Sequence, residues 1–506
     1  MKKIISLGLV LLMCLTTLIA CGGTTDEPET TTPGENVTTP SEGGDVTTDA
    51  VVTGDVTVGN LQGETVKILA WGDAENLEFE HDDTKADQAT ISDAILQRNT
   101  NVTTHLNAVL EFIYTPGNYN NQQAYVTKAE SFANGDEGEF VDILASYSMT
   151  TALASTKGLC ANLMQYEKKD GGLNFDHPWW PQTLVKEAMF DGMLFVCTGD
   201  ISTNLLWMME TMYFSKDLLI DLKGESAPKE LYKLADDGKW TIAKFYEYCT
   251  DVYSDLNTDG KKSAGDQVGY ICTWDGYFDD FYVGAGFNMC ERDSSGKLII
   301  SPEWGGERED NFVKGLVDFT FTNDFLYATD ATAKEMFPTG KALFHNDRAK
   351  YAKTARETAE IEYGILPMPK YDETQENYST CLGFPHTLYA ISSTSTQPEN
   401  AALVLESMAA NGYTEITPVL FEDALKLRYS PELEDAMMFD ILRDSTCFDV
   451  GRIYCTPLDN NSWDIFRSSI AKGSTSYVTK IKASMKASQT LVDALIADLT
   501  KAGNMK

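Results

Sequence analysis

Short apolar runs alternate with a helix-like stretch along most of this chain, a pattern typical of an α/β protein. Ile91, Ile95 and Val102 recur near helical spacing and predict a helix over 91–102. Buried strands are expected at 65–71, 140–146, 193–200, 267–274 and 361–369. Each run ends in polar or aromatic residues, and ligands of open α/β sheets bind beyond the carboxyl ends of the strands. We therefore expect several strand ends to meet at one cleft.

The first apolar run of the chain differs from the others because Lys2 and Lys3 precede it. A charged start followed by apolar residues 4–19 is the layout of a secretory signal, and the run is too short to span a membrane. The run closes on Leu-Ile-Ala-Cys at 18–21, which resembles the lipobox of bacterial lipoproteins. Residues 1–20 are thus expected to be a lipoprotein signal peptide and Cys21 the lipidated residue. The alternative is an ordinary secretory signal with an incidental cysteine.

The segment after Cys21 has a different composition. Residues 22–63 are rich in Thr, Gly, Pro, Asp and Glu and contain no Lys, Arg or aromatic residue. Such a stretch buries too little apolar surface to offset its chain entropy, so residues 21–63 are predicted to be a disordered linker behind the lipid anchor. The chain from residue 64 onward is about three times the length of a typical domain, which favours two or more lobes.

Charge and cysteine content exclude several classes of partner and site. The formal net charge is −36, which argues against nucleic acid and anionic lipid, because clustered cations bind both. Eight of the ten cysteines remain after Cys14 of the signal and Cys21 are set aside, and none forms a CxxC pair. They are interpreted as small buried residues or sporadic disulfides, not as a metal or redox cluster.

From about residue 65 to the C-terminus, an ordered set of motifs resembles the extracellular solute-binding proteins of bacterial ABC importers, especially the sugar-binding, maltose-binding-protein-like group. The motifs are DAILQRNTNV (93–102), FDGMLFVCTGD (190–200), METMYFSKDLL (209–219), GKWTIAKFYEYCTDV (238–252), GKALFHNDRAKYA (340–352), YGILPMPKY (363–371) and LYAISSTSTQPENAALVLESMA (388–409). The resemblance implies an α/β, two-lobed periplasmic-binding-protein-like (type II) fold with a hinge and an interlobe cleft. It places lobe 1 at 64–203 plus 372–410 and lobe 2 at 204–371 plus 411–506, with crossovers near Thr203, Tyr371 and Ala410.

The same resemblance implies a function. The chain is expected to capture a carbohydrate, specifically an oligosaccharide, between its lobes and deliver it unchanged to an ABC permease. It would be lipid-anchored at the cell membrane and face the extracellular side. Two alternatives stay open from the sequence, a surface-anchored glycan-active hydrolase and a glycan-binding adhesion module.

One loop has the spacing of a calcium site. DLNTDGKKSAGD at 255–266 has the ligand pattern of an EF-hand loop, with Gly260 at the position of the sharp bend. The expected ligands are Asp255, Asn257, Asp259, the Lys261 carbonyl, Ser263 and Asp266. Asp266 stands where a longer Glu is usual. We expect a structural calcium, and the alternative is an acidic turn without an ion.

Aromatic residues beside polar ones indicate a sugar site, because sugars present flat C–H faces ringed by hydroxyl groups. The candidate ligand-binding residues are Trp71, Asp73, Ser146, Tyr147, Asp200, Trp274, Asp275, Tyr277, Asp347, Arg348 and Trp463. Each aromatic residue has the alternative of packing in the core. Trp274 and Tyr277 are favoured because the corresponding segment of the resembling family supplies a stacking residue.

Signatures of common enzymes are missing from the sequence. It contains no HExxH, GxSxG, Walker phosphate loop or GxGxxG motif, and its five histidines have no metal-ligand spacing. A glycosidase needs only two suitably spaced carboxylates, for which Glu78 with Glu80 and Asp279 with Asp280 are candidates. The sequence favours a protein that is not an enzyme.

Overall fold

The computed structural model describes residues 59–73, 77–84, 88–430 and 432–504. The described residues all belong to one compact unit. A second unit, Met1–Val52, lies outside the described residues, as do the predicted signal peptide, Cys21 and most of the predicted linker. No helix among the described residues is long and apolar enough to cross a membrane.

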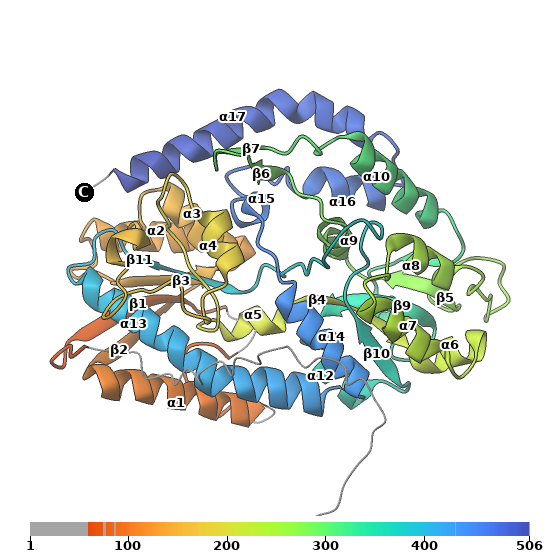
Figure 1. Cartoon of the computed structure of the whole chain (residues 1–506), viewed down its shortest axis with the longest axis horizontal. Coiled ribbons are helices and arrows are strands. Elements are labelled where there is room, and N and C mark those ends of the chain that lie inside the picture. Colours follow the sequence, from red (N-terminus) through yellow and green to blue (C-terminus); the bar gives the residue numbers. More distant parts are fainter. Residues whose placement is uncertain (1–58, 74–76, 85–87, 431, 505–506) are drawn as a thin grey trace, which may run out of the picture. The chain divides into compact units, whose positions relative to one another are not determined.

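Two main β-sheets form the framework of the described chain, together with a small hairpin (Figure 1). The first sheet has the order β11-β3-β1-β2, and the second has the order β10-β4-β9-β5-β8. Parallel pairs predominate in the first sheet, where only β11 runs antiparallel to its neighbour. The strands are β1 (Thr65–Trp71), β2 (Val109–Thr115), β3 (Ile143–Tyr147), β4 (Glu210–Ser215), β5 (Val268–Cys272), β6 (Cys290–Arg292), β7 (Leu298–Ile300), β8 (Phe325–Tyr327), β9 (Ala342–Arg348), β10 (Tyr363–Leu366) and β11 (Thr387–Ile391).

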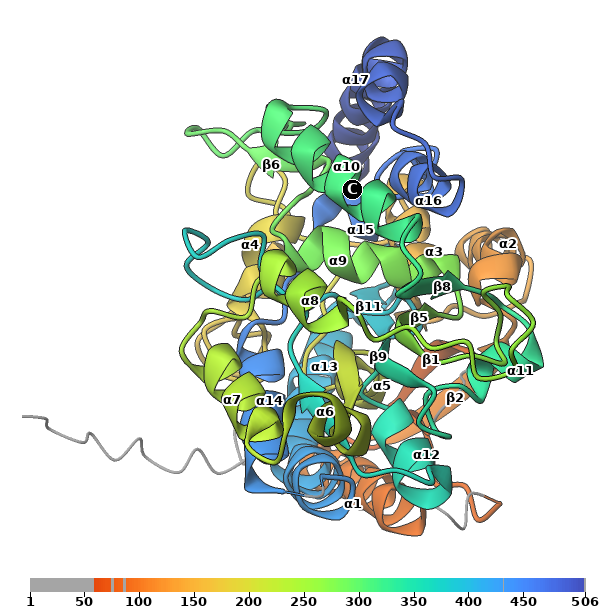
Figure 2. The same cartoon turned by 90° about the vertical axis from the view of Figure 1, so that its right-hand side faces the viewer.

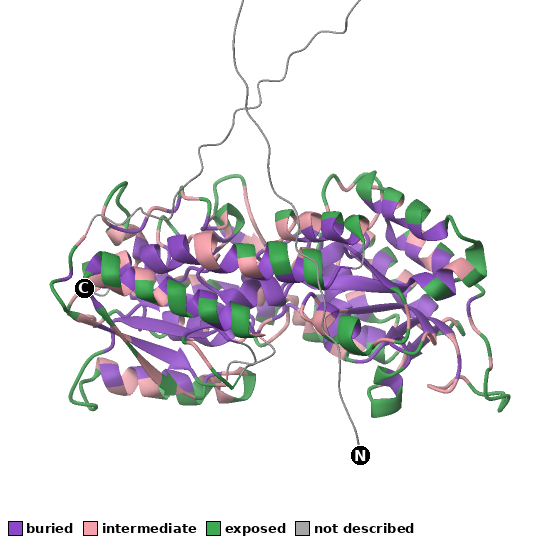
Figure 3. Cartoon of the chain, turned by 90° about the horizontal axis from the view of Figure 1, so that it is seen from below, coloured by how far each residue is buried: buried purple, intermediate pink, exposed green. Residues whose placement is uncertain are grey.

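Helices cover both sheets. The α-helices are α1 (Ala89–Leu106), α2 (Gln122–Ala133), α3 (Ser148–Thr156), α4 (Gln182–Ala188), α5 (Thr203–Trp207), α6 (Lys216–Lys223), α7 (Ala227–Asp236), α8 (Ile242–Cys249), α9 (Phe278–Gly284), α10 (Glu307–Thr320), α11 (Ala331–Lys334), α12 (Tyr351–Thr358), α13 (Pro398–Asn411), α14 (Leu433–Asp444), α15 (Val450–Ile453), α16 (Asp464–Ala471) and α17 (Tyr477–Gly503). On the first sheet, α1 and α13 pack together on one side and α2 and α3 on the other (Figure 1). The strands are largely buried, whereas the outer faces of these helices are exposed (Figure 3).

Most of the predicted elements are present. The strand expected at 65–71 is β1, and the helix expected at 91–102 lies within α1. The runs at 267–274 and 361–369 contain β5 and β10. The run at 140–146 contains most of β3, but the strand begins at Ile143, because Phe140 is exposed and precedes the buried part of the run.

The strand predicted at 193–200 is wrong. The segment is extended, but it meets β11 at one residue pair, where Cys197 and Tyr389 exchange backbone hydrogen bonds of 2.9 and 2.8 Å. Gly199 then turns the chain with a φ of +150°, and a Cβ atom there would lie 2.1 Å from the carbonyl oxygen of Trp179. The apolar segment is therefore buried here but does not form a continuous strand paired with β11.

Two segments lie side by side where the chain passes between the sheets. Met209 forms an antiparallel bridge with Leu382, and Gly383 donates a 2.8 Å hydrogen bond to the carbonyl of Met208. The strands of the first sheet come from 64–203 and 372–410, and those of the second from 204–371. The predicted lobe boundaries themselves stay predictions.

The C-terminal part of the chain contacts both groups of elements. Helix α15 packs on α3, and α16 packs on α9 and α10. Helix α17 runs across both groups and contacts α3, β7 and α10 (Figures 1 and 2). The tail therefore supplies side chains to any site between the two sheets.

Candidate ligand-binding pocket

A cavity of about 500 Å³ lies where ends of strands from both sheets approach the C-terminal tail. We call it the Trp274 pocket. It is lined by Asn118, Tyr119, Asn120, Tyr147, Met149, Trp274, Asp275, Arg348, Phe384, Pro385, Trp463 and Arg467. The lining includes Tyr147, Trp274, Asp275, Arg348 and Trp463, which are predicted ligand-binding residues.

Three strand ends position this lining. Tyr147 is the last residue of β3, Trp274 follows β5, and Arg348 is the last residue of β9. Strands β5 and β9 are parallel neighbours, so their carboxyl ends emerge at the same edge of the second sheet. This arrangement is the one expected for ligand sites of α/β sheets.

Two aromatic side chains in the Trp274 pocket are exposed. Trp274 is 41% exposed and Tyr119 is 48% exposed. The indole of Trp274 lies against Gly276, where a Cβ atom would come within 2.3 Å of the ring, so a larger residue there would displace the indole. Exposed aromatic faces in a cavity gain free energy when an apolar surface covers them. The pocket is thus suited to a ligand with flat apolar faces.

Guanidinium groups flank the aromatic rings. Those of Arg348 and Arg467 lie 5.7 and 5.6 Å from the ring centre of Trp274, and that of Arg467 lies 4.0 Å from Trp463. These distances allow cation–π attraction, which helps to fix the rings. Arg467 donates from Nε (2.7 Å) and Nη2 (2.5 Å) to Asp279, which also accepts a hydrogen bond from Arg452.

The carboxylates suggested as a hydrolase pair at 279 and 280 do not line the pocket. Both are buried, and burial tends to raise the pKa of Asp279, but its two arginine partners lower that pKa below its usual value. Burial, with the nearby Glu210 and Asp279, raises the pKa of Asp280 well above its usual value, and Asn346 donates to it. This pair is a buried ionic cluster.

The second suggested pair is also outside the pocket. Glu78 accepts hydrogen bonds from Ser202 (2.5 Å) and Thr387 (2.8 Å), and burial raises its pKa to about 7. Glu80 accepts a hydrogen bond from Tyr114 on the exposed side of the first sheet. Neither pair faces the Trp274 pocket from opposite sides, as two catalytic carboxylates of a glycosidase must.

A second cavity of about 500 Å³ adjoins the Trp274 pocket and shares Trp274 and Arg348 with it. Tyr277 and Asp347 line this second cavity together with His345, Tyr351 and Lys334. The two predicted residues therefore lie beside the pocket, on the other side of Trp274. We call the two cavities together the Trp274 groove.

The remaining predicted residues do not line the groove. Trp71 and Ser146 are buried, and the indole N–H of Trp71 donates to Thr387 (2.8 Å). Asp73 accepts hydrogen bonds from the backbone of Gly117 and Asn118, so it shapes the loop that enters the pocket.

Asp200 lies at a separate cavity. Its carboxylate accepts hydrogen bonds from Thr417 and from Arg443, the latter at 3.2 Å, and burial raises its pKa. That cavity is lined by Tyr413, Phe421 and residues of α4, α5 and α14 and shares no residue with the Trp274 groove.

Sequence reasoning missed Tyr119 and Arg467. The segment 118–121, Asn-Tyr-Asn-Asn, sets an aromatic residue among amides and was a usable signal for a sugar site. Arg467 follows Trp463 by four residues, a spacing that places both on one face of a helix. What the sequence could not provide is the packing of this tail over the strand ends.

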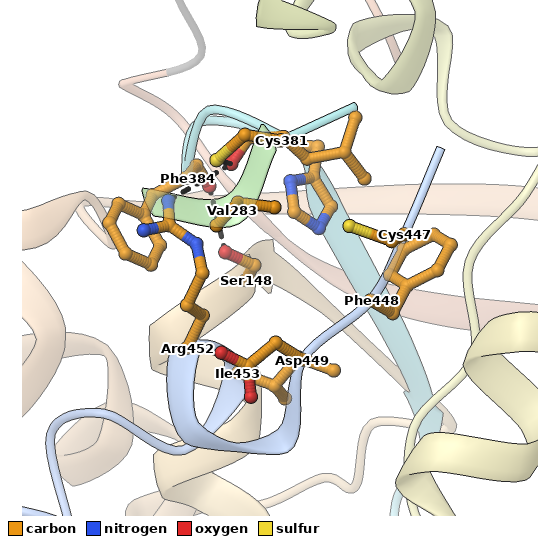
Figure 4. Close-up of a pocket in the computed structure, with 11 residues that line it drawn as sticks. Ser148, Val283, Cys381, Phe384, Cys447, Phe448, Asp449, Arg452 and Ile453 are labelled. Carbon is orange, nitrogen blue, oxygen red and sulfur yellow. Dashed lines mark hydrogen bonds between the residues drawn. The ribbon is translucent and has the colours of Figure 1, made fainter. Parts of the chain in front are cut away.

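A much smaller cavity, of about 30 Å³, lies near the joint between the sheets (Figure 4). Ser148, Cys381, His386, Cys447 and Arg452 are among its lining residues. His386 donates from Nδ1 to the carbonyl of Gly383 (2.9 Å), and burial lowers its pKa to about 4, so the ring is neutral. A space of this size holds about one water molecule and not a sugar.

The predicted calcium loop is partly organised for a cation. The N–H of Gly260 donates to Asp255 (2.9 Å) and that of Ser263 donates to Asp266 (2.8 Å). The Oδ1 atoms of Asp255 and Asp266 are buried and have no hydrogen-bond partner in the described part of the chain. Across the described residues, no three His, Cys, Asp or Glu side chains are grouped closely enough to hold a metal ion. The loop fits calcium in residue type and in these two oxygens, but its carboxylates are not gathered around one point.

Comparison with solved structures identifies proteins with the same fold. No family model matches the chain, and no curated protein matches it in sequence. A solved cyclo/maltodextrin-binding protein complexed with maltotetraose is 13% identical, with 87% of this chain and 98% of that chain covered and a TM-score of 0.53. The extracellular solute-binding protein from Staphylococcus aureus in complex with maltose is 12% identical, with 86% and 97% covered and a TM-score of 0.53. The predicted two-lobed type II periplasmic-binding-protein-like fold is thereby confirmed.

Proposed function

We propose that this chain is an extracellular solute-binding protein that captures an oligosaccharide between its lobes and delivers it unchanged to an ABC permease. The observation that carries the proposal is the Trp274 pocket, a cavity between strand ends of both sheets with Trp274 and Tyr119 exposed in it. Two solved proteins of this fold are complexes with maltotetraose and with maltose, which supports a sugar as the class of ligand.

The chemistry of the pocket suits a sugar. Aromatic faces bind the C–H faces of a pyranose, and polar side chains at the rim exchange hydrogen bonds with its hydroxyl groups. Asn118, Asn120 and Asp275 provide amide and carboxylate groups beside the aromatic residues. Because lining residues come from both sheets, a ligand that contacts both favours a closed arrangement of the lobes.

The alternatives have less support. A hydrolase needs two carboxylates on opposite sides of the bound sugar. In the described chain Asp275 lines the Trp274 pocket, whereas Asp347 lines only the adjoining cavity, where the backbone of Arg348 and the ring of His345 contact it. An adhesion module is expected to bind a polymer on an open face without closing on a short ligand.

Ligand binding is tested by a thermal-shift screen of mono- and oligosaccharides. We expect one oligosaccharide class to raise the melting temperature, because a ligand that binds only the folded state stabilises it. Small-angle scattering with that ligand should show a smaller radius of gyration, and chromatography should recover the ligand intact. Cleaved products would support the hydrolase, and binding of polymer alone without compaction would support the adhesion module.

We also propose that Cys21 carries a lipid that holds the protein at the outer face of the cell membrane. The lipobox-like residues 18–21 and the acidic linker composition support this assignment. Incorporation of labelled palmitate into the wild-type chain and not into Cys21→Ser is expected.

Calcium binding at 255–266 is a further part of the proposal. The orphaned Oδ1 atoms of Asp255 and Asp266 support it, because buried carboxylate oxygens are normally paired or bound to a metal. Residues Asp255, Asn257, Asp259, Ser263 and Asp266, with the Lys261 carbonyl, would hold the ion, which would cross-link the loop before β5.

Asp259→Ala is expected to abolish any rise in melting temperature that calcium causes in the wild-type protein. The variant removes one carboxylate of the loop, and hard cations require several charged oxygen ligands. Melting curves with calcium and with a chelator provide the measurement. Asp221→Ala, at an exposed aspartate of α6, is the control and should keep the calcium response. An unchanged response in Asp259→Ala would exclude the loop.

A further inference from the structure

The two cavities of the Trp274 groove differ in the parts of the chain that line them. The cavity on the far side of Trp274, which we call the Tyr351 cavity, is lined only by residues between Thr273 and Tyr351. They follow β5 and β8 or belong to β9, α11 and α12, in the part of the chain that builds the second sheet. The Trp274 pocket, by contrast, has lining residues from the first sheet, the second sheet and the C-terminal tail.

This difference determines how each cavity affects closure of the lobes. A ligand shifts the equilibrium between open and closed arrangements only by as much as its affinities for the two arrangements differ. A ligand in the Trp274 pocket contacts both sheets, so its contacts are complete only when the lobes are closed. A ligand in the Tyr351 cavity contacts the second sheet and its own helices, and these contacts are the same in both arrangements. The Tyr351 cavity therefore adds affinity without favouring closure.

The Tyr351 cavity has groups that suit a sugar. Thr329 and Lys334 are exposed and line it, and no described residue forms a hydrogen bond with the Thr329 hydroxyl or the Lys334 ammonium. Trp274, which is 41% exposed, borders both cavities with its indole. An aromatic surface beside side chains that can exchange hydrogen bonds with hydroxyl groups is the combination that binds a sugar ring.

The size of the two cavities sets the length of a ligand that fills both. Each cavity has a volume of about 500 Å³. Pockets of about 300–1,000 Å³ enclose a drug-sized ligand, which corresponds to about two sugar rings. Because the cavities adjoin at Trp274 and Arg348, one chain of sugars passes from the first into the second beside the indole. Such a ligand is about four sugar rings long.

We propose that the Tyr351 cavity is a second subsite, which binds the far end of an oligosaccharide whose first rings occupy the Trp274 pocket. This inference rests on the proposed function and specifies the ligand as an oligosaccharide of about four sugar rings or more. The rings in the Trp274 pocket draw the lobes together, and the rings in the Tyr351 cavity hold the chain on the second sheet. Chain length then sets the affinity, whereas occupation of the Trp274 pocket sets closure.

Two homologous series of oligosaccharides test the proposal. They run from maltose to maltohexaose and from cellobiose to cellohexaose, joined by the series of any other linkage that the thermal-shift screen identifies. Each member is titrated calorimetrically against the full-length protein. In the series that binds, we expect the affinity to rise at least about tenfold from the disaccharide to the tetrasaccharide and then to level off, because the added rings bury further surface only until the second cavity is full.

Small-angle scattering of the same samples separates affinity from closure. At saturation, every member of the series should lower the radius of gyration by the same amount, because the disaccharide already occupies the Trp274 pocket. A compaction that increases with chain length would overturn the division of roles between the two cavities.

Thr329→Trp places a large side chain in the Tyr351 cavity from an exposed position. This variant is expected to abolish the gain in affinity with chain length and to leave the affinity for the disaccharide unchanged. Thr479→Trp, at an exposed threonine of α17 that lines neither cavity, is the matched control and should keep the gain.

Two further variants test the same division by removing side chains. Lys334→Ala, at an exposed lysine of the Tyr351 cavity, should weaken binding of the tetrasaccharide about threefold and leave the disaccharide unchanged. Tyr119→Ser, on the side of the Trp274 pocket, should weaken all members by a common factor and keep the gain with chain length, because Tyr119 does not line the Tyr351 cavity.

The outcomes separate the second subsite from the proposed function. An affinity that does not rise with chain length, a gain that Thr329→Trp leaves intact, or a disaccharide that no longer binds to Thr329→Trp would overturn the second subsite and leave the binding of sugars intact. A protein that binds no member of any series would overturn the inference together with the proposed function.

Discussion

Trp274→Ala is expected to abolish the ligand-induced rise in melting temperature while leaving the melting temperature of the free protein nearly unchanged. The indole is 41% exposed and follows the end of β5, so its removal takes little buried surface from the core. For the ligand, the same indole is the largest exposed apolar face shared by both cavities of the groove. Loss of such a face is expected to weaken binding by at least about tenfold, which removes the rise when the ligand is present near the wild-type dissociation constant.

Two further variants make this expectation specific. Trp274→Phe retains a smaller aromatic face and should keep part of the ligand response. Trp240→Ala removes an indole that is 0% exposed and packed on Phe245 and Phe344. This variant should lower the free energy of unfolding of the ligand-free protein by about 3–5 kcal/mol. If Trp274→Ala instead behaved like Trp240→Ala, the indole would be part of the core and not a ligand platform.

The sequence correctly predicted those strands and helices whose own apolar pattern matches the residues they bury. Strand β1 is a run of seven residues in which Val66 and residues 68–71 are apolar and buried, so the apolar pattern was sufficient to predict the strand. The segment at 193–200 has an equally apolar pattern, but Gly199 and the nearby Trp179 prevent a ladder from continuing. Apolar periodicity reports burial, and it does not report whether a neighbouring strand is present.

The candidate site was predictable to the extent that it lies at strand ends. Tyr147, Trp274 and Asp275 follow or close predicted strands, Arg348 lies in the family-like motif at 340–352, and the structure brings the four together. Trp71 and Ser146 occupy similar positions in sequence, yet both are buried: the indole of Trp71 donates to Thr387 of β11, and the hydroxyl of Ser146 donates to the carbonyl of Gly117. The direction of a side chain at a strand end depends on the sheet register, which a single sequence does not specify.

The site residues of the C-terminal tail could not be predicted from strand ends, because they reach the pocket through tertiary packing. Arg467 belongs to α16 and Trp463 directly precedes that helix, which reaches the pocket because it packs on α9 and α10. The contact between Arg467 and Asp279 spans 188 positions in the sequence. Long-range ion pairs of this kind follow from tertiary packing and leave no local signature in the sequence.

Asp279→Ala is expected to lower the free energy of unfolding by about 3–5 kcal/mol, the cost of leaving buried charges without their partner. Asp279 is buried in α9 and binds Arg467 of α16 and Arg452 of α15, so it joins the second sheet's helices to the tail. Urea denaturation of the free protein measures the loss. Asp275→Ala, four residues away with no hydrogen bond described for its side chain, is the control and should change stability by less than about 1 kcal/mol.

The lowered pKa of Asp279 predicts a second effect of Asp279→Ala, on the way stability depends on pH. Because the folded-state pKa lies below its usual value, the ionised carboxylate stabilises the fold above the unfolded pKa, and this contribution is lost as pH falls through the folded pKa. Asp279→Ala should therefore be less sensitive to acid than the wild type between about pH 4 and the folded pKa. It should also weaken sugar binding, since Arg467 and Trp463 lose the anchor that holds them over the Trp274 pocket. A variant that keeps wild-type stability and acid response would mean that the two arginines find other partners, and the tail would then not depend on Asp279.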